Sequence, residues 1–404
     1  MVGIAVRGQA SVDRRGGYRW VVLALCWLAF TMTVADHAVW GPTALSASAG
    51  LAWALAGLSV FVVGYYLGYL LFTAVGGFLT DWLGGRVIVG SSLVAGAALM
   101  VLFGQATSTA AGIVFQACVG LFAGASYSAG VKLIAQWFAP TRRGFATGVF
   151  MTATSLGTVL ATTTAPLLVE WAGEQASYYV FGGASTLVAV LCLVFLRDGT
   201  AAGDRPGRLP DPRPVVRDRD LLVLGAAGFG ALWGASGFVT WAGVAMVRGG
   251  QVAPIQAGVV VTIFVIAAVV TKPLVGLASD LSGGKRKVPI IVALGGFVVT
   301  LLVFGAGSDL TAFLWTAPFL GIAAYASSPL MVALVPGLSG PARAGSASGL
   351  TNAMWQLGAV AAPLVVSAVF DATGSFFLVF ATLAAGPFAG LLLMLLVREH
   401  RAVH

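Results

Sequence analysis

The stretch Gly77-Phe78-Leu79-Thr80-Asp81-Trp82-Leu83-Gly84-Gly85-Arg86 separates two long apolar runs. It returns in the second half of the chain as Gly276-Leu277-Ala278-Ser279-Asp280-Leu281-Ser282-Gly283-Gly284-Lys285-Arg286-Lys287. In both copies a Gly is followed four residues later by an Asp, and then by a Gly pair and basic residues. This spacing predicts a helix that ends near the Asp, a tight glycine turn, and a next helix with a cationic start. Two copies in two halves predict a chain that is built twice.

The composition places most of the chain in lipid. Of the 404 residues, 59% are hydrophobic and only 9% are charged, whereas soluble globular proteins carry about 25% charged residues. Glycine is abundant, as in closely packed membrane helices. A net charge of +8 would suggest nucleic acid as a partner of a soluble protein, but here the positions of the basic residues explain it without nucleic acid.

The basic residues follow the positive-inside pattern. Lys132 and Lys272 fall inside apolar segments, and Arg248 falls in a loop that would lie outside. The remaining Lys and Arg residues fall in loops or tails on the other side, which is the cytoplasmic side by the positive-inside rule. We therefore predict a multi-pass protein of the cytoplasmic (inner) membrane with both termini in the cytoplasm. The first apolar run is long enough to span and lacks a convincing cleavage site.

The apolar segments form two groups of six around a charged linker. The first group covers residues 19–43, 54–81, 87–106, 110–138, 144–170 and 176–196, and the second covers 220–247, 254–281, 288–306, 310–335, 344–370 and 374–397. The Pro-rich, charged residues 197–219 cannot enter lipid. We predict an all-α membrane protein with an N-terminal tail (1–18), two six-helix bundles (19–196 and 220–397), a cytoplasmic linker (197–219) and a C-terminal tail (398–404).

A second internal similarity supports the repeat. Arg142-Arg143-Gly144-Phe145-Ala146-Thr147-Gly148 opens the fifth segment, and Arg343-Ala344-Gly345-Ser346-Ala347-Ser348-Gly349 opens the eleventh. Small residues at this density allow helices to approach closely. Generic small-residue packing without mobility is the alternative.

The duplicated glycine–aspartate stretch resembles the loop signature of the major facilitator superfamily between helices two and three, and its repeat between helices eight and nine. Trp82 and Gly85 depart from the basic residues that are usual at their positions. The resemblance covers residues 18–398 and implies a fold of two six-helix bundles, a monomer, and a conformational latch at the cytoplasmic face. The latch residues it implies are Gly77, Asp81, Arg86, Arg143 and Asp280; the alternative is a solvated turn that only reverses the chain.

Two branches of the superfamily share further motifs with this chain. The runs Gly64-Tyr65-Tyr66-Leu67-Gly68-Tyr69 and Gln136-Trp137-Phe138-Ala139-Pro140 resemble the anion:cation symporter branch, as does Asp36-His37, which is similar to its helix-one Asp-Arg pair. Gln116 and Ala123 stand where that branch has an Arg and a Glu. Lys272-Pro273 is similar to the helix-eight pattern of oxalate and monocarboxylate transporters, in which a basic residue before Pro binds a carboxylate. Both branches mainly carry carboxylates.

Ionisable residues inside membrane spans are costly, so each is a functional hypothesis. Asp36 is the candidate for proton coupling and His37 for a substrate or proton partner, unless the first span ends early and leaves both in water. Lys272 is the candidate anion anchor and Lys132 a second cationic contact. The alternative for both lysines is a side chain that snorkels to the membrane surface.

Neutral polar and aromatic residues complete a predicted binding cavity, although each could equally be ordinary contact between helices. The candidates are Tyr65, Tyr69, Tyr127, Trp233, Tyr325, Asn352 and Gln356. Asn352 and Gln356 are four residues apart and share a helix face.

We therefore predict a secondary active transporter that moves a small organic anion, a carboxylate, by alternating access and with proton coupling. Its partners would be this solute, protons and the lipid bilayer. A drug or neutral-solute:proton transporter is the alternative, although no adjacent Gly-Pro stands between Gly148 and Pro166, where a drug antiporter would show one. A membrane-embedded enzyme is the alternative from another class, but no nucleophile–base pair or metal cluster is recognisable in the sequence. We expect no cofactor and no metal, and a packing role for Cys26, Cys118 and Cys192.

Overall fold

The computed structural model describes residues 2–43, 59–199, 211–249 and 252–399, with side chains from residue 16 onward except at Ser59. Within these residues the chain is helical and contains no strand. The first half holds α1 (Val2–Ala38), α3 (Ser59–Leu83), α4 (Gly85–Phe103), α5 (Thr109–Trp137), α6 (Arg143–Ala172) and α7 (Glu174–Phe195). The second half holds α9 (Arg219–Arg248), α10 (Pro254–Leu281), α11 (Lys287–Gly305), α12 (Leu310–Ser339), α13 (Ala344–Thr373) and α14 (Phe376–Leu396).

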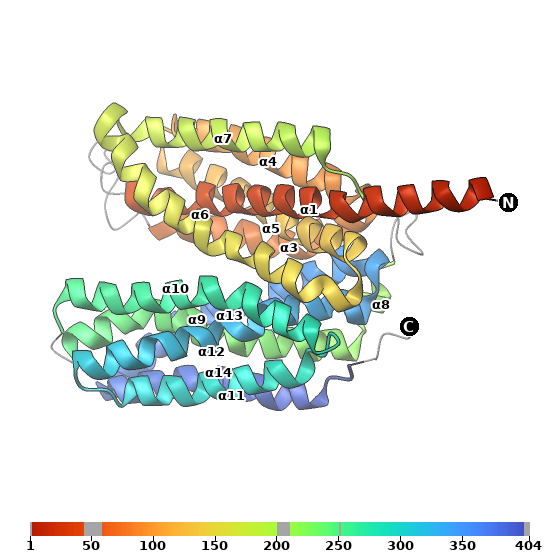
Figure 1. Ribbon diagram of the computed structural model, residues 1–404. Coiled ribbons are helices and arrows are strands. Elements are labelled where there is room, and N and C mark those ends of the chain that lie inside the picture. Colours follow the sequence, from red (N-terminus) through yellow and green to blue (C-terminus); the bar gives the residue numbers. More distant parts are fainter. Residues whose placement is uncertain (1, 44–58, 200–210, 250–251, 400–404) are drawn as a thin grey trace.

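These 12 helices of the described chain are long and apolar enough to cross a membrane. They pack as two six-helix halves, one above the other in Figure 1. The predicted fold class, an all-α membrane protein of two six-helix bundles, is confirmed. Helix α1 begins at Val2, before the predicted start of the first segment at residue 19, and its membrane-spanning part begins at Gly16.

The linker is described only in part. Residues 200–210 of the predicted linker lie outside the described residues, and so do residues 54–58 of the second predicted segment. The short helix α8 (Arg213–Val216) lies in the linker and buries Val215. We call the end of the molecule that carries α8 and the C-terminal end of α14 the linker end, and the other the opposite end (Figure 1).

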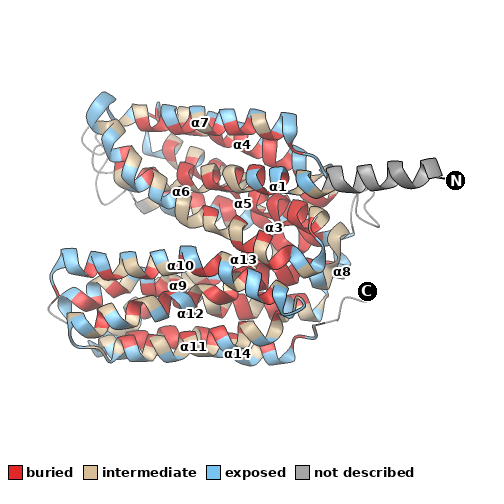
Figure 2. Ribbon diagram, in the orientation of Figure 1, coloured by how far each residue is buried: buried red, intermediate tan, exposed pale blue. Residues whose placement is uncertain are grey.

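Polar side chains cap the N-termini of α5 and α12, which are equivalent helices of the two halves. The Ser108 hydroxyl accepts a hydrogen bond from the Ala111 amide at the start of α5, and the Asp309 carboxylate accepts one from the Ala312 amide at the start of α12. Such caps satisfy amide groups that have no partner inside the helix. The outward faces of the helices are exposed and rich in large apolar side chains such as Leu71, Trp171 and Ile255 (Figure 2), as expected of surfaces that contact lipid.

Glycine decides how closely α3 and α5 pack. A methyl group at Gly68 would lie 1.9 Å from the Ala117 carbonyl oxygen, and one at Gly120 would lie 2.0 Å from the Tyr65 carbonyl oxygen. The two backbones therefore touch directly, as in membrane helix pairs with small residues at the crossing.

We predict that Gly68→Ala destabilises the protein, because α3 and α5 would have to separate to admit the methyl group. Overpacking of this kind costs about 1–3 kcal/mol. Gly183→Ala on α7 is the matched control, since nothing lies within 4 Å of its added methyl group. The melting temperature of the detergent-purified protein should fall for Gly68→Ala and stay or rise for Gly183→Ala. Equal melting temperatures would contradict the close backbone contact.

Candidate functional site

The two halves meet at the linker end through the carboxylate of Asp81. This residue lies near the C-terminal end of α3 and accepts hydrogen bonds from the first amides of α13. The distances are 3.0 Å from the Gly345 amide, 2.7 Å from the Ser346 amide and 2.5 Å from the Ser346 hydroxyl. The N-terminus of a helix favours a negative charge because its amides are unpaired and its dipole is positive there.

Asp280 makes the equivalent contact in the second half. It lies at the end of α10 and accepts hydrogen bonds from the Gly144 amide at 2.9 Å and the Phe145 amide at 2.8 Å, at the start of α6. We call the contacts of Asp81 with α13 and of Asp280 with α6 the interdomain latch. Each carboxylate belongs to one half and caps a helix of the other half.

Glycine lets the latch helices approach. A methyl group at Gly77 would lie 2.3 Å from the Gly345 carbonyl oxygen, and one at Gly276 would lie 2.2 Å from the Gly144 carbonyl oxygen. The α3–α13 and α10–α6 crossings thus have the same backbone-to-backbone contact. The carboxylates reach the helix termini because no side chain holds the backbones apart.

The charges around the two carboxylates differ. The ammonium nitrogen of Lys132, on α5, lies 3.2 Å from a carboxylate oxygen of Asp81, and both side chains are 1% exposed. Asp280 has Arg286 instead, at 4.0 Å. Burial lowers the pKa of the Arg286 guanidinium from its ordinary value, and the carboxylates of Asp280 and Glu399 act in the opposite direction. Lys132 therefore lies in a buried ion pair and not at the lining of the central cavity.

The remaining predicted latch residues lie within the first half. The Arg86 guanidinium donates to the Leu193 carbonyl near the end of α7. The Arg143 guanidinium donates to the Phe138 carbonyl at 3.1 Å and the Ala135 carbonyl at 2.6 Å, at the end of α5. Cations at helix C-termini are stabilising, so in this conformation both arginines support the ends of helices in their own half.

A cavity of about 280 Å³ lies between the halves. Five of the predicted binding residues besides Lys272 line it: Tyr69, Tyr127, Tyr325, Asn352 and Gln356. The cavity is also lined by residues that the sequence analysis did not single out, namely Phe30, Met151, Thr154, Ser327, Met331 and Trp355. Spacing could have indicated Met151, because it follows Gly148 by three residues, about one further turn on α6.

Lys272 is buried in the cavity wall and bridges the two halves. Its ammonium nitrogen, from α10, donates to the Met151 carbonyl at 3.2 Å, to the Thr154 hydroxyl at 3.0 Å and to the Ser155 hydroxyl at 3.3 Å, all on α6. It also lies 4.9 Å from the centre of the Tyr325 ring, a cation–π distance. These partners are neutral, so Lys272 brings a positive charge into the cavity.

Asn352 and Tyr69 form a second bridge between the halves. The Asn352 amide on α13 donates to the Tyr69 hydroxyl on α3 at 2.8 Å. The cavity therefore has a cationic wall at α6 and α10 and a neutral polar wall at α3 and α13.

The other predicted binding residues lie away from this cavity. His37 stacks on Tyr65 with ring centres 3.6 Å apart, in an aromatic cluster of the first half. Trp233 donates from its indole nitrogen to the Thr382 carbonyl on α14 at 3.1 Å. Gln116 is buried in the first half, and its amide has no hydrogen-bond partner within the described residues.

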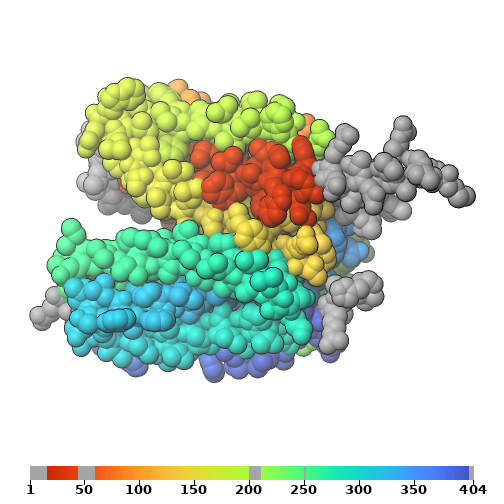
Figure 3. All heavy atoms as spheres, in the orientation of Figure 1, coloured from red at the N-terminus to blue at the C-terminus, as the bar shows by residue number. Residues whose placement is uncertain are grey.

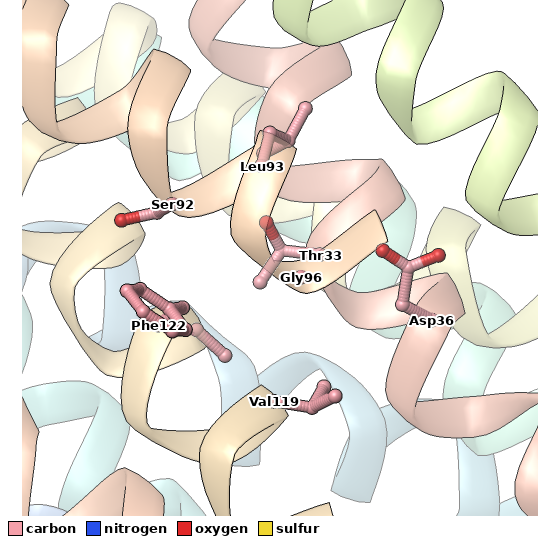
Figure 4. A pocket seen from close by; sticks show the side chains of 8 residues that line it. Thr33, Asp36, Ser92, Leu93, Gly96, Val119 and Phe122 are labelled. Carbon is pink, nitrogen blue, oxygen red and sulfur yellow. The ribbon is translucent and has the colours of Figure 1, made fainter. Parts of the chain in front are cut away.

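Asp36 lies inside the first half and not at the central cavity. It is 3% exposed, and it accepts a hydrogen bond from the Ser185 hydroxyl at 2.8 Å. A void of about 10 Å³ beside it is lined also by Thr33 of α1 and Ser92 of α4 (Figure 4). Such a space is about the size of one water molecule. Asp36 is thus a buried carboxylate with no cationic partner among the described residues.

The molecule is closed at the linker end and hollowed at the opposite end. Figure 3 shows the two halves in contact toward the linker end and parted toward the opposite end. A wide space of about 600 Å³ at this end is lined by α9 and α10 of the second half, among others by Val239, Gly243, Val247 and Arg248 of α9 and by Val261 of α10.

We predict that Asp81→Asn destabilises the protein more than Asp280→Asn does. The first change removes the carboxylate that neutralises the buried Lys132, and breaking a buried ion pair in this way costs about 3–5 kcal/mol, whereas the second leaves a partly exposed site with a more distant arginine. Melting temperatures of the purified variants measure the difference.

The double variant Asp81→Asn/Lys132→Met is the control, because it removes the buried charge together with its partner. Its melting temperature should recover toward that of the unmodified protein. A double variant that is no more stable than Asp81→Asn would show that the ion pair is not the cause.

Comparisons with known proteins agree with this architecture. The sequence model of the Major Facilitator Superfamily matches residues 20–253 and 250–404. The probable nitrate/nitrite transporter NarK2 of Mycobacterium tuberculosis is 29% identical over 360 residues, covering 85% of this chain and 88% of that protein. The probable galactarate/D-glucarate transporter GudP of Bacillus subtilis is 23% identical over 415 residues, covering 91% and 90%.

Solved structures share the fold. The transporter FucP in the outward conformation superposes with a TM-score of 0.79 at 13% identity, over 95% of this chain and all of that one (100%). The human organic anion transporter MFSD10 superposes with a TM-score of 0.77 at 18% identity, over 93% of this chain and 99% of that one. The family match over nearly the whole chain, the six-plus-six helices and the duplicated latch lead to one conclusion: this chain is a transporter of the Major Facilitator Superfamily.

Proposed function

We propose that this protein carries a small organic anion, a carboxylate, across the cytoplasmic membrane by alternating access, coupled to protons. The observation that supports the anion most directly is Lys272, a buried ammonium in the central cavity whose hydrogen-bond partners among the described residues are all neutral. A buried charge without a counterion is costly, and an anionic solute would supply the missing charge. Lys offers a point charge for this purpose.

The positions of the openings support alternating access. The linker end is rich in basic residues, so it would face the cytoplasm, and the hollow at the opposite end would face outward. The conformation described would then be outward-facing, with the interdomain latch closed on the cytoplasmic side. To reach the other state, the amides of α6 and α13 would have to leave the carboxylates of Asp280 and Asp81, and the halves would rock about the central site.

Asp36 supports the coupling part of the proposal. It is a carboxylate inside a membrane span, where an ionisable residue is a candidate member of a proton pathway. Because Asp36 lies in the first half and Lys272 in the second, the proton and the anion would bind at separate places. Coupling would then pass through the movement of α1 and not through direct contact.

Inorganic anions are the second candidate. The similarity to NarK2, a probable nitrate/nitrite transporter, favours them, and Lys272 would serve nitrate as it serves a carboxylate.

We predict that Lys272→Gln abolishes anion counterflow in proteoliposomes, with uptake at least about tenfold below that of the unmodified protein. Lys285→Gln is the matched control, because Lys285 is an exposed lysine of the loop after α10. Retained counterflow in Lys272→Gln would refute the anion anchor.

We predict that Asp36→Asn loses accumulation driven by a proton gradient but keeps counterflow, since exchange of solute needs no net proton movement. Asp371→Asn, an exposed acid at the end of α13, is the control. Accumulation at unmodified levels in Asp36→Asn would rule out this residue as the coupling site.

A further inference from the structure

The charge of the cavity limits the charge of its solute. Lys272 is the only Lys, Arg, Asp or Glu among the described residues that line the cavity. A solute with one negative charge would neutralise the site. A dianion would bring a second, unpaired negative charge into a region surrounded by apolar helices, where such charges are strongly disfavoured. The balance of charge therefore favours a monoanion over a dicarboxylate.

The volume of the cavity sets a lower limit on the size of the solute. A volume of about 280 Å³ is many times the roughly 10–15 Å³ of cavity that a single water molecule needs. Nitrate, with four heavy atoms, would leave most of this volume unfilled and would touch only one wall. A solute that contacts Lys272 and the aromatic side chains of the lining together must be larger than nitrate.

The walls determine the character of that body. Phe30, Tyr127 and Trp355 present aromatic side chains, and Met151, Met331 and Leu232 add apolar ones. Phe30 and Tyr127 already contact each other with ring centres 5.8 Å apart, a distance typical of aromatic pairs. Such walls stabilise a flat or compact apolar group. They cannot replace the hydration of one that carries many hydroxyl groups.

Some of the polar side chains that line the cavity already have protein partners. Asn352 and Tyr69 are bonded to each other, and the Trp355 indole donates to the Leu224 carbonyl at 3.3 Å. Ser327 lines the cavity with a buried hydroxyl that has no partner within the described residues. A sugar acid would lose several hydrogen bonds to water and would have to compete with these protein contacts to regain them, which costs affinity.

We infer that the central cavity takes a monocarboxylate with a compact apolar body about the size of a six-membered ring, its carboxylate at Lys272 and Thr154. This inference rests on the proposed anion transport and narrows its substrate class. The apolar body of the solute would lie among Phe30, Tyr127 and Trp355, and the Ser327 hydroxyl would be available to a single polar substituent.

A ligand series on the purified full-length protein tests the inference. The series is benzoate, cyclohexanecarboxylate, benzamide, phthalate, gluconate and nitrate, scored by the rise in melting temperature, since a ligand that binds the folded state stabilises it. Benzoate and cyclohexanecarboxylate should act at concentrations about tenfold or more below the others. Benzamide controls for the charge, phthalate for a second charge, gluconate for polarity, and nitrate for size.

Two variants separate the site from non-specific effects. Lys272→Gln should remove stabilisation by benzoate. Ala231→Leu adds bulk to a partly exposed residue of the cavity wall. It should weaken the binding of benzoate at least about tenfold and leave the binding of nitrate unchanged. Counterflow of labelled benzoate in proteoliposomes should follow the same order.

The outcomes distinguish a failure of the apolar monocarboxylate from a failure of anion transport itself. Stabilisation by gluconate, phthalate or nitrate in preference to benzoate, lost in Lys272→Gln, would overturn the apolar monocarboxylate and leave anion transport standing. Stabilisation by benzamide equal to that by benzoate, unchanged in Lys272→Gln, would overturn both. An Ala231→Leu protein that melts normally and still binds benzoate at full strength would also overturn the placement in this cavity.

Discussion

The carboxylates of Asp81 and Asp280 at helix N-termini of the opposite half are the contacts on which this conformation depends. Each places a negative charge where a helix offers unpaired amides and a positive dipole. The contact requires glycines at the crossing, because any side chain would keep the backbones apart. Hydrogen bonds of this kind can be broken and remade as a unit. A closed end held by polar contacts is therefore compatible with halves that later move apart.

The two latch contacts are alike in geometry and unlike in charge. Asp81 is paired with the buried Lys132, whereas Asp280 is nearer to the surface and faces Arg286 at a longer distance. Internal duplication explains the shared backbone contact, and the later divergence of single side chains explains the difference. The α3–α13 side should be the more costly to open if the Asp81–Lys132 pair has to rearrange, because a buried charge that loses its partner is strongly destabilising.

Lys272 links solute binding in the cavity to the contacts between the two halves. Lys272 belongs to α10 and donates to α6, about two helical turns from the Asp280 contact between the same two helices. An anion that binds the ammonium would compete with the hydroxyls of Thr154 and Ser155 for it, and would thereby alter a contact between the halves. Binding and movement can be linked in this way because a solute shifts a conformational equilibrium only through contacts that differ between the two states.

The sequence by itself determined the membrane helices, their duplication and the residues at the two latch loops, since apolar length, glycine and charge are properties of short segments. It also identified Lys272, because an ionisable residue within a span is conspicuous wherever it faces. Only the tertiary structure decided that Lys132 pairs with Asp81, that Arg86 and Arg143 support helix ends in their own half, and that His37 and Trp233 contact neighbours away from the cavity. It likewise revealed Thr154, Ser327 and Trp355 in the cavity wall. The reason is physical: in a helix that is apolar on all sides, the pattern of residues does not indicate which face looks inward, and packing against the other helices sets that rotation.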